Sequence, residues 1–286
     1  FPPITVEPVT ENAVAGDPWV GHFPTTDEHF GKLVWHHESF GDDLDTHLSA
    51  SRIRQHADRA VEWIVSQPGR CKKAYRTLLG DLFHALMGET EHGTKLDQDT
   101  RSAKVWALTL EAIAYSVAKL ASVCDEVEVR GVKGNHDGFL FFVAMDALRE
   151  RLRPVENVTV HPTPSYFDTF RVGSTLHVLD HGYRVGTLTG WKAKAQAEVV
   201  AREIVFIDDP GTTEIYTYVG HLHEEERASH GSHLQLIRLA SLGEADDFET
   251  SLRYASLPVA RLFRLDDDGL IETERVLRRR DFARAA

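Results

Sequence analysis

The stretch Val129-Arg130-Gly131-Val132-Lys133-Gly134-Asn135-His136-Asp137-Gly138 joins a β-strand pattern to a polar turn. β-Branched residues alternate with polar ones over residues 126–132, which predicts a strand. Glycines on both sides of the Asn-His-Asp triplet let the backbone turn sharply. An isolated triplet of this kind is also common in ordinary loops. The rest of the chain therefore decides whether these residues have a chemical role.

The composition is that of a globular protein. The chain has 286 residues, of which 42% are hydrophobic, enough for one large domain or two small ones. No apolar run approaches the roughly 20 residues that cross a bilayer, so we expect no membrane association. The two cysteines, Cys71 and Cys124, cannot form a disulfide framework. A reducing, cytoplasmic location is therefore expected.

The chain carries a formal net charge of -12. This charge argues against a protein that wraps nucleic acid over its whole surface. It does not exclude an enzyme that acts on nucleic acid, because bound divalent cations would offset negative charge where a phosphate docks.

Three regions follow from the pattern of prolines and charges. Residues 1–24 contain five prolines and no clear periodicity, so we expect an extended arm or linker there. The chain begins at Phe1, and an upstream domain that has been removed stays an open alternative. Residues 278–286 begin with three arginines and are expected to form a basic, solvated tail, with phosphate contact as the alternative.

Residues 25–277 are expected to form one domain. The predicted helices span about 46–66, 101–123, 139–153 and 191–204. Short strands are predicted at 126–132, 158–160, 170–172, 176–179 and 215–219, and antiparallel β-structure within 233–240, 251–265 and 270–277. Strands alternate with helices first and form hairpins later, which predicts an α/β fold: a sandwich of mixed β-sheets flanked by helices.

Five predicted turns at the ends of apolar runs carry residue types that bind metals. They hold Asp27 and His29, Asp81 and His84, Asn135 and His136, His181, and His221 and His223. The carboxyl ends of neighbouring strands converge on one crevice in sheets of this kind, so these residues could meet there. Carboxylate, imidazole and amide ligands suit borderline and hard divalent ions. The set is too large for one tetrahedral ion and fits two ions that share a carboxylate. Nine of the ten other histidines are expected to be structural, namely His36, His37, His47, His56, His92, His161, His177, His230 and His233.

The ordered blocks Asp-x-His, Gly-Asp, Gly-Asn-His-Asp, His and Gly-His-x-His, between Asp27 and His223, resemble those of the calcineurin-like metallophosphoesterase superfamily. This resemblance implies that superfamily's sandwich fold and two divalent ions. Manganese is expected, with iron, zinc, magnesium and nickel as alternatives. The ligands implied for the first ion are Asp27, His29, Asp81 and His223. Those implied for the second ion are Asp81, Asn135, His181 and His221, so that Asp81 bridges the two.

The same resemblance implies roles for two further residues. His136 would lie beside the substrate phosphate as proton donor or charge stabiliser, and Asp137 would orient its imidazole. The ions would lower the pKa of a bridging water and clamp the phosphate oxygens. A proton donor of this kind typically contributes about 10²–10⁴-fold to the rate.

The block Gly80-Asp81-Leu82-Phe83-His84 is similar to the repair-nuclease branch, which includes the SbcD-type exonucleases and related phage proteins. A histidine three positions after the bridging Asp supports exonuclease action there, which implies this role for His84. The implied substrate is single-stranded DNA or a frayed DNA end. Lys32, Arg149, Arg151 and Arg184 are candidates for a basic entrance, but no substrate-binding residue is assigned.

Two departures from that branch keep other functions open. About 60 residues follow His223, too few for the separate DNA-capping domain of the repair nucleases, and the chain is acidic. A phosphodiesterase or phosphatase acting on a nucleotide or other small phosphate ester is the alternative. A metal-binding or scaffolding protein without catalysis is a third reading, and a homodimer stays open.

Overall fold

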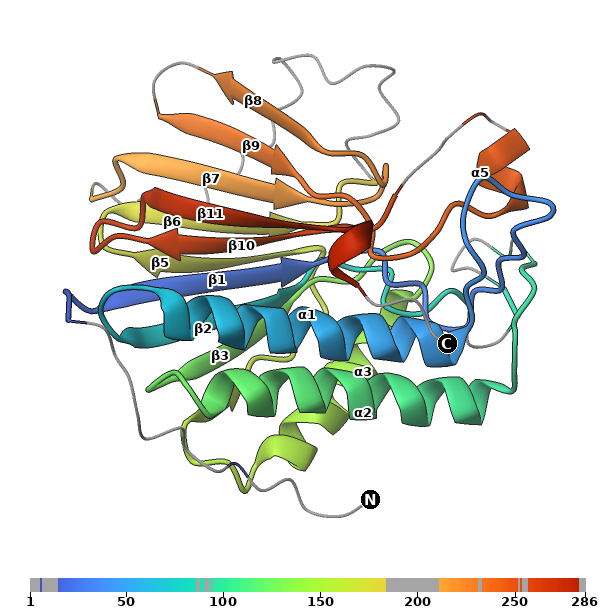
Figure 1. The fold of residues 1–286 in the computed structure, drawn as a ribbon, viewed down its shortest axis with the longest axis horizontal. Helices are drawn as coiled ribbons and strands as arrows, with labels where there is room; N and C mark the ends of the chain where they lie inside the picture. Colours follow the sequence, from blue (N-terminus) through green and yellow to red (C-terminus); the bar gives the residue numbers. More distant parts are fainter. Residues whose placement is uncertain are drawn as a thin grey trace.

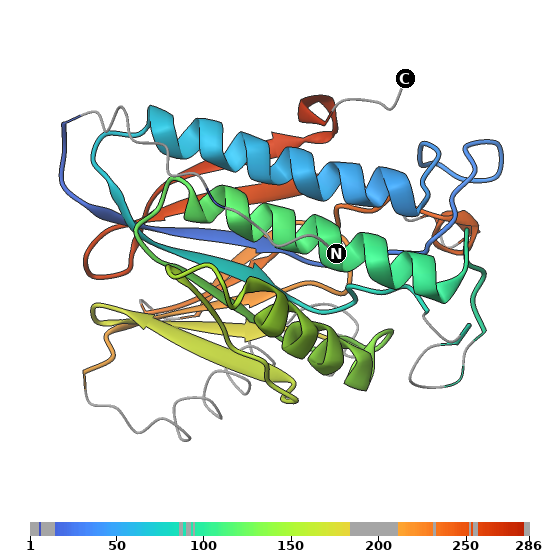
Figure 2. The ribbon, with the colours of Figure 1, turned by 90° about the horizontal axis from the view of Figure 1, so that it is seen from below.

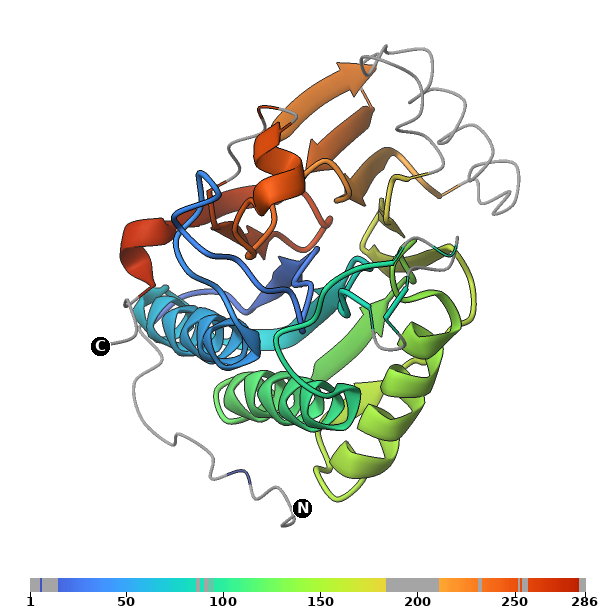
Figure 3. The ribbon, with the colours of Figure 1, turned by 90° about the vertical axis from the view of Figure 1, so that its right-hand side faces the viewer.

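Two mixed β-sheets pack face to face in the computed structural model of the chain, and three helices cover one of them (Figure 1). The structure describes residues 15–85, 95–183, 211–230, 233–251 and 257–282, together with positions 6, 88, 89, 93 and 253. Seen from the end in Figure 3, the helices, the first sheet and the second sheet lie in successive layers. The expected sandwich of mixed sheets flanked by helices is confirmed.

The first sheet has six strands in the order β11-β10-β1-β2-β3-β4. Its strands are β1 (Trp19–Thr25), β2 (Cys71–Leu78), β3 (Val127–Gly131), β4 (Val158–Val160), β10 (Val259–Leu265) and β11 (Ile271–Arg278). Strands β1 to β4 run parallel to one another. Strand β10 pairs antiparallel with both β1 and β11. The carboxyl ends of β1, β2 and β3 therefore meet at one edge of the molecule.

The second sheet has five strands in the order β5-β6-β7-β9-β8. Its strands are β5 (Phe167–Val172), β6 (Thr175–Asp180), β7 (Glu214–Val219), β8 (Glu226–His230) and β9 (Leu234–Arg238). Strands β6, β7 and β9 are parallel, and the antiparallel strands β5 and β8 form the two edges.

Three long helices cover the outer face of the first sheet (Figure 2). They are α1 (Thr46–Ser66), α2 (Ser102–Ala121) and α3 (Gly138–Leu152). Helix α1 begins where the Asp45 carboxylate accepts a hydrogen bond from the Leu48 amide at 2.7 Å. It ends just before Pro68, whose ring disfavours a helical conformation at the preceding residue.

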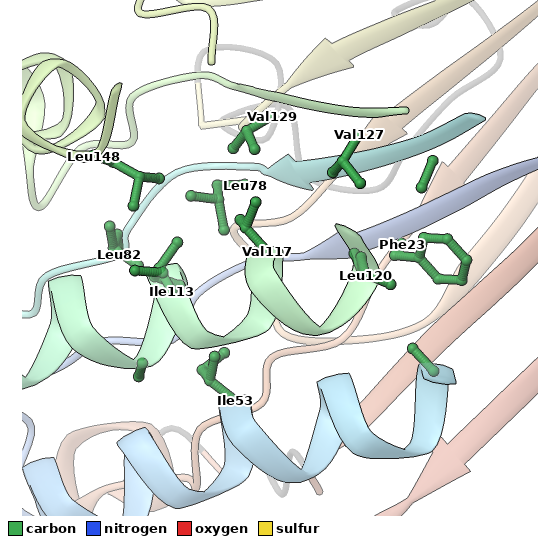
Figure 4. Close-up of a cluster of buried hydrophobic side chains, with 14 of the residues drawn as sticks. Phe23, Ile53, Leu78, Leu82, Ile113, Val117, Leu120, Val127, Val129 and Leu148 are labelled. Carbon is green, nitrogen blue, oxygen red and sulfur yellow. The ribbon is translucent and has the colours of Figure 1, made fainter. Parts of the chain in front are cut away.

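The apolar stripe of α2 packs between α1 and the sheet, as its three-to-four spacing predicts (Figure 4). Ile113, Val117 and Leu120 are fully buried there against strand residues such as Leu78 and Val129. A second core lies between the two sheets and is rich in aromatic side chains. Its largest members are Tyr75, Phe170, Tyr216, Tyr218 and Phe263.

The expected N-terminal arm ends earlier than residue 24. Trp19–Thr25 is strand β1, which lies inside the first sheet and is buried along its whole length. Gly21, His22 and Pro24 interrupt its hydrophobic pattern, so that it does not look like a strand in the sequence. The Nε2 of the buried His22 is hydrogen-bonded to the Thr77 hydroxyl, with Nε2 and Oγ1 2.8 Å apart.

The C-terminal part also departs from the expectation. Strand β9 pairs antiparallel with β8, as expected for residues 233–240, but its other neighbour, β7, is parallel to it. Antiparallel β-structure was expected from residue 251 onward, but residue 251 is the last residue of the short helix α5 (Asp247–Ser251). Strand β8 was not predicted. The predicted helix at 191–204 lies outside the described residues.

The basic tail is anchored at its start. A 3₁₀ turn, η1 (Arg279–Asp281), follows β11, and Arg279 forms an ion pair with Asp42. Phe282 is buried against the helical core. This part of the expected tail is therefore not free in solvent. No helix in the described part of the chain is long and apolar enough to cross a membrane.

Candidate metal centre

The residues predicted to bind metal all follow parallel strands at one edge of the sandwich, which Figure 3 turns toward the viewer. The first sheet supplies Asp27 and His29 after β1, Asp81 after β2 and Asn135 after β3. The second sheet supplies His181 after β6, and His221 and His223 after β7. The site thus spans the ends of both sheets.

The structure brings these residues together in two adjoining clusters. In each, the potential ligand atoms lie within 4.8 Å of one another: Asp27, His29 and His223 form the first, and Asp81, His181 and His221 the second. Asn135 joins the second cluster, with its Oδ1 3.2 Å from His181 Nε2. His181 Nε2 also lies 3.1 Å from Asp81 Oδ2 and 3.9 Å from Asp27 Oδ1, so the two clusters are neighbours. The resemblance implied Asp81 as a ligand shared by both ions, whereas the structure groups it with His181 and His221 only. The metal-binding role of these residues stays a prediction.

Most of these ligand positions have a left-handed backbone. Six non-glycine residues in the described part of the chain have positive φ, and five of them are predicted ligands. They are Asp27 (53°), His29 (46°), Asp81 (53°), His221 (70°) and His223 (55°), with Arg253 (63°) as the sixth. Such conformations cost of order 1–3 kcal/mol each and persist only where the surroundings enforce them. Their concentration at one site makes this site the first candidate for function in the described part of the chain.

Two glycines allow the loops to approach each other closely. A Cβ on Gly134 would lie 2.0 Å from Asp81 Oδ1, and a Cβ on Gly220 would lie 1.9 Å from Thr26 Oγ1 and 2.4 Å from Asp27 Oδ2. Any side chain at either position would therefore displace a carboxylate of the site.

Hydrogen bonds fix one oxygen of each carboxylate and leave the other directed into the site. Asp27 Oδ2 accepts from Thr26 Oγ1 at 2.6 Å and from the His221 amide at 2.9 Å. Asp27 Oδ1 is buried without a hydrogen-bond partner, and His223 Nε2 is 3.3 Å away. Asp81 Oδ1 similarly accepts from the His136 amide at 2.7 Å. A buried, unpartnered anionic oxygen among imidazoles fits a bound cation.

The ring of His181 is oriented by the backbone. Its Nδ1 donates to the Leu79 carbonyl at 2.7 Å, which leaves Nε2 directed at the carboxylates. Although burial opposes protonation, the Asp81 and Asp27 carboxylates raise the pKa of His181 to about 10. His221, by contrast, is kept neutral, because burial and the neighbouring His181 lower its pKa to about 4.

Glu249 is a site residue that the sequence did not reveal. It comes from α5, and its Oε1 accepts a hydrogen bond from His223 Nδ1. Burial opposes protonation of His223, but Asp27 and Glu249 raise its pKa to about 9. The pattern Asp246-x-x-Glu249 signals a helix start, yet nothing in it points to a histidine 26 positions earlier.

His136 lies beside both clusters, with Nε2 3.9 Å from Asp81 Oδ2 and a side chain that is 20% exposed. Its Nδ1 donates to the backbone carbonyl of His84 at 2.9 Å. The His84 side chain is buried nearby, and its ring centroid is 5.5 Å from that of His136. Burial and Lys32 lower the pKa of His84 to about 3, so its imidazole is neutral.

The expectation that Asp137 orients the His136 imidazole is wrong, because the His84 carbonyl occupies that position. Asp137 instead accepts from the Gly134 amide at 2.9 Å and from the Leu82 amide at 2.7 Å. It therefore ties the loop after β3 to the loop after β2. Burial and the nearby Asp81 raise the pKa of Asp137, whereas the two amide hydrogen bonds favour its ionised form and oppose this shift.

The cations expected at the entrance are placed differently. Lys32 is only 2% exposed and pairs with Glu249 at 2.6 Å and Asp246 at 3.1 Å. Arg149 pairs with Asp146 along α3 at 2.6 Å. Arg184 lies outside the described residues. Lys32 is therefore an internal counter-ion and not a surface contact for substrate.

No protein-family model and no curated protein sequence matches the chain. Solved structures with a similar arrangement include a dimetal phosphatase from Danio rerio, with 12% identity, a TM-score of 0.44 and coverage of 92% of this chain and 99% of that chain. Vacuolar protein sorting 29 from Cryptosporidium parvum has 13% identity, a TM-score of 0.42 and coverage of 91% and 96%. A predicted phosphoesterase from Streptococcus pneumoniae has 11% identity, a TM-score of 0.36 and coverage of 91% and 98%. At these identities and TM-scores, the similarities carry no argument about the activity of this chain.

Proposed function

We propose that this chain is a phosphoesterase that depends on two divalent metal ions. The observation that carries the proposal is the pair of adjoining clusters, Asp27-His29-His223 and Asp81-His181-His221, with Asn135 beside the second. The oxygen and nitrogen donors fit borderline and hard divalent ions. The unpartnered Asp27 Oδ1 fits a cation in the first cluster.

Two bound ions would supply charge stabilisation and an activated water for attack on phosphorus. The chain's own residues do the remaining work. Asp27, Asp81 and the ligand histidines would hold the ions, and Asp137 keeps the two central loops together. The His84 carbonyl accepts from Nδ1 of His136, so Nε2 faces the site, and the doubly protonated ring would donate its Nε2 proton to the leaving oxygen.

The test of the dinuclear centre is the metal content of purified protein that has been loaded with excess Mn²⁺ and desalted. We expect close to two ions per chain. Asp81→Asn, which alters the proposed bridge, should lower the occupancy of both positions. Asp267→Asn removes an exposed carboxylate in the turn between β10 and β11 and serves as the matched control. A folded wild-type protein that retains one ion or none would contradict the proposal.

For the substrate, we propose a phosphodiester of DNA, in a single strand or at a frayed end. The support is the similarity of the Gly80–His84 block to repair nucleases, and a flexible strand reaches a recessed site with few contacts. The burial of Lys32 in ion pairs and the net charge of -12 favour the alternative, a nucleotide or other small phosphate ester.

A Mn²⁺-supplemented panel separates the two substrates. It contains labelled single-stranded, frayed and blunt duplex DNA, a small phosphodiester and a phosphomonoester. Weak, salt-sensitive cleavage of single-stranded or frayed DNA is expected, and His84→Ser should impair it more than hydrolysis of the small diester. Survival of every DNA form together with rapid turnover of a nucleotide or phosphomonoester would replace the nuclease proposal by the alternative.

A further inference from the structure

Helix α5 reaches the metal centre from a distant part of the chain. It lies beside the loop that follows β1, at the edge of the molecule that carries the site (Figures 1 and 3). The Phe40 amide donates to Thr250 Oγ1 at 3.0 Å, which fastens the helix to this loop. The position of α5 brings Glu249 to His223.

Each oxygen of the Glu249 carboxylate has a defined partner. Oε1 accepts from His223 Nδ1, and Oε2 accepts from Lys32 Nζ at 2.6 Å and from the Asp246 amide at 2.9 Å. Asp246 Oδ1 accepts from the Glu249 amide at 2.8 Å in return. This reciprocal pair is a capping box, which holds the Glu249 side chain through the backbone. The carboxylate is therefore fixed before any ligand binds.

The hydrogen bond at Nδ1 determines which nitrogen His223 offers to the site. Because Nδ1 donates to Glu249, Nε2 is the atom directed inward, 3.3 Å from Asp27 Oδ1 and 3.2 Å from His29 Nε2. We propose that Glu249 is a positioning residue that fixes the ring orientation and tautomer of His223 for metal binding, an inference that rests on the proposed dinuclear function.

Lys32 completes this arrangement as the counter-ion of Glu249. Its ammonium group is buried between Glu249 and Asp246, where it offsets the charge that the carboxylate brings next to His223. A carboxylate behind a ligand histidine makes the imidazole a better electron donor, and its loss typically costs about 10–100-fold in metal affinity. The Nδ1 of His181 donates to the backbone carbonyl of Leu79, which a substitution does not remove. The partner of His223 Nδ1 is the Glu249 side chain, so it can be removed by substitution.

The test compares Glu249→Gln with Asp247→Asn. Gln has the shape of Glu without its charge, and Asp247 is an exposed acid in the same helix turn, so each variant removes one negative charge from α5. Metal-free protein is titrated with Co²⁺, and binding is followed by calorimetry and by the visible absorption of the bound ion. We expect Glu249→Gln to weaken one of the two binding steps by about 10–100-fold and to change its absorption spectrum. Asp247→Asn should bind both ions as the wild type does.

A double-mutant cycle with His223→Asn distinguishes positioning from a general effect on the fold. If Glu249 acts through His223, Glu249→Gln should cause no further loss of affinity in the His223→Asn background. The inference is overturned if Glu249→Gln causes an equal loss of affinity in both backgrounds, or if its Co²⁺ binding is unchanged. The proposed function still stands in that case, provided that the wild type binds two ions. A wild-type protein that binds no Co²⁺ would overturn the proposed function, and the role of Glu249 with it.

Discussion

At the scale of single residues, His136 is the histidine to which the proposed function gives proton transfer and not metal binding. His136 belongs to the same loop as Asn135 but is held by the His84 carbonyl, and its Nε2 lies 3.9 Å from the nearest Asp81 oxygen. Its imidazole is also more exposed than that of His181, which is fully buried. This placement suits a group that meets the substrate.

His136→Asn should therefore lower turnover by at least about a hundredfold while the metal content stays unchanged, as the loss of a general acid implies. Steady-state kinetics and metal analysis of the same preparations provide the measurement. Turnover close to that of the wild type would show that His136 is not the proton donor. Loss of one ion would make it a ligand instead.

The sequence predicts the ligand residues better than it predicts what holds them. Asn135 stands out because it follows a strand pattern, and Asp27 and His29 stand out as an Asp-x-His pair of metal-binding residue types. The partner of each ligand depends on which loops meet in space. The sequence therefore does not reveal that Glu249 lies behind His223, or that the His84 carbonyl holds the ring of His136.

At the scale of elements, the central feature is the link between the loops that follow β2 and β3. The Asp137 carboxylate accepts from amides in both loops and is almost fully buried. These loops carry Asp81 and Asn135, which the proposal assigns to the same ion. The relative position of the two ligands thus depends on a residue that binds no metal itself.

Asp137→Asn should destabilise the protein and lower its metal content. An amide has one acceptor oxygen in place of two, so one of the two buried amide donors loses its partner, which costs about 1–3 kcal/mol. Urea unfolding of the metal-free protein measures this cost. Asp146→Asn, on the exposed side of α3, is the control and should leave both stability and metal content unchanged. Equal stability of the two variants would contradict this role of Asp137.

Helices and strands with a clear hydrophobic period or clear end signals could be predicted from the sequence. Strands that depend on their neighbours in the folded protein could not. The α1 helix matches its predicted range, 46–66, because a side-chain cap and a proline mark its ends. Strand β1 was missed because it is buried on both faces although it contains Gly21, His22 and Pro24. The parallel pairing of β9 depends on long-range order of the strands, which no local pattern encodes.

At the scale of the whole molecule, the two sheets are held together by a core that includes neutral histidines. His177 stacks on Phe170 with ring centroids 4.5 Å apart, and His22 packs against Tyr218 at 4.4 Å. Burial lowers the pKa of His177 to about 3, and burial together with His177 and Arg76 lowers the pKa of His22 well below its ordinary value. Both rings are therefore uncharged in the folded protein at neutral pH.

These two histidines should make the protein sensitive to acid. The unfolded chain takes up a proton at each histidine near pH 6.5, whereas the folded protein resists protonation, so stability falls as pH decreases below about 6.5 toward the folded pKa. Between pH 6.5 and 5 the loss should reach up to about 2 kcal/mol per histidine. Urea unfolding at a series of pH values measures it.

His177→Phe keeps the aromatic stacking and should flatten the pH dependence of the unfolding free energy in this window. His47→Gln changes an exposed histidine and should leave the dependence as it is in the wild type. If both variants follow the wild-type pH profile, the His177 ring does not resist protonation as proposed here.

The left-handed backbone at Asp27, His29, Asp81, His221 and His223 sets a limit on how this protein can be improved. Glycine has no Cβ and adopts such conformations more readily than histidine or aspartate, so replacing these residues by glycine should relieve backbone strain while it removes the donors. A library of variants that is selected for heat resistance alone, in a medium without divalent ions, should therefore accumulate glycine at the histidine positions of this set before the two aspartates, whose carboxylates accept buried hydrogen bonds. Substitutions that raise the stability at these positions remove the side chains that would bind metal. A thermostable form that retains the site must therefore gain its stability from substitutions elsewhere.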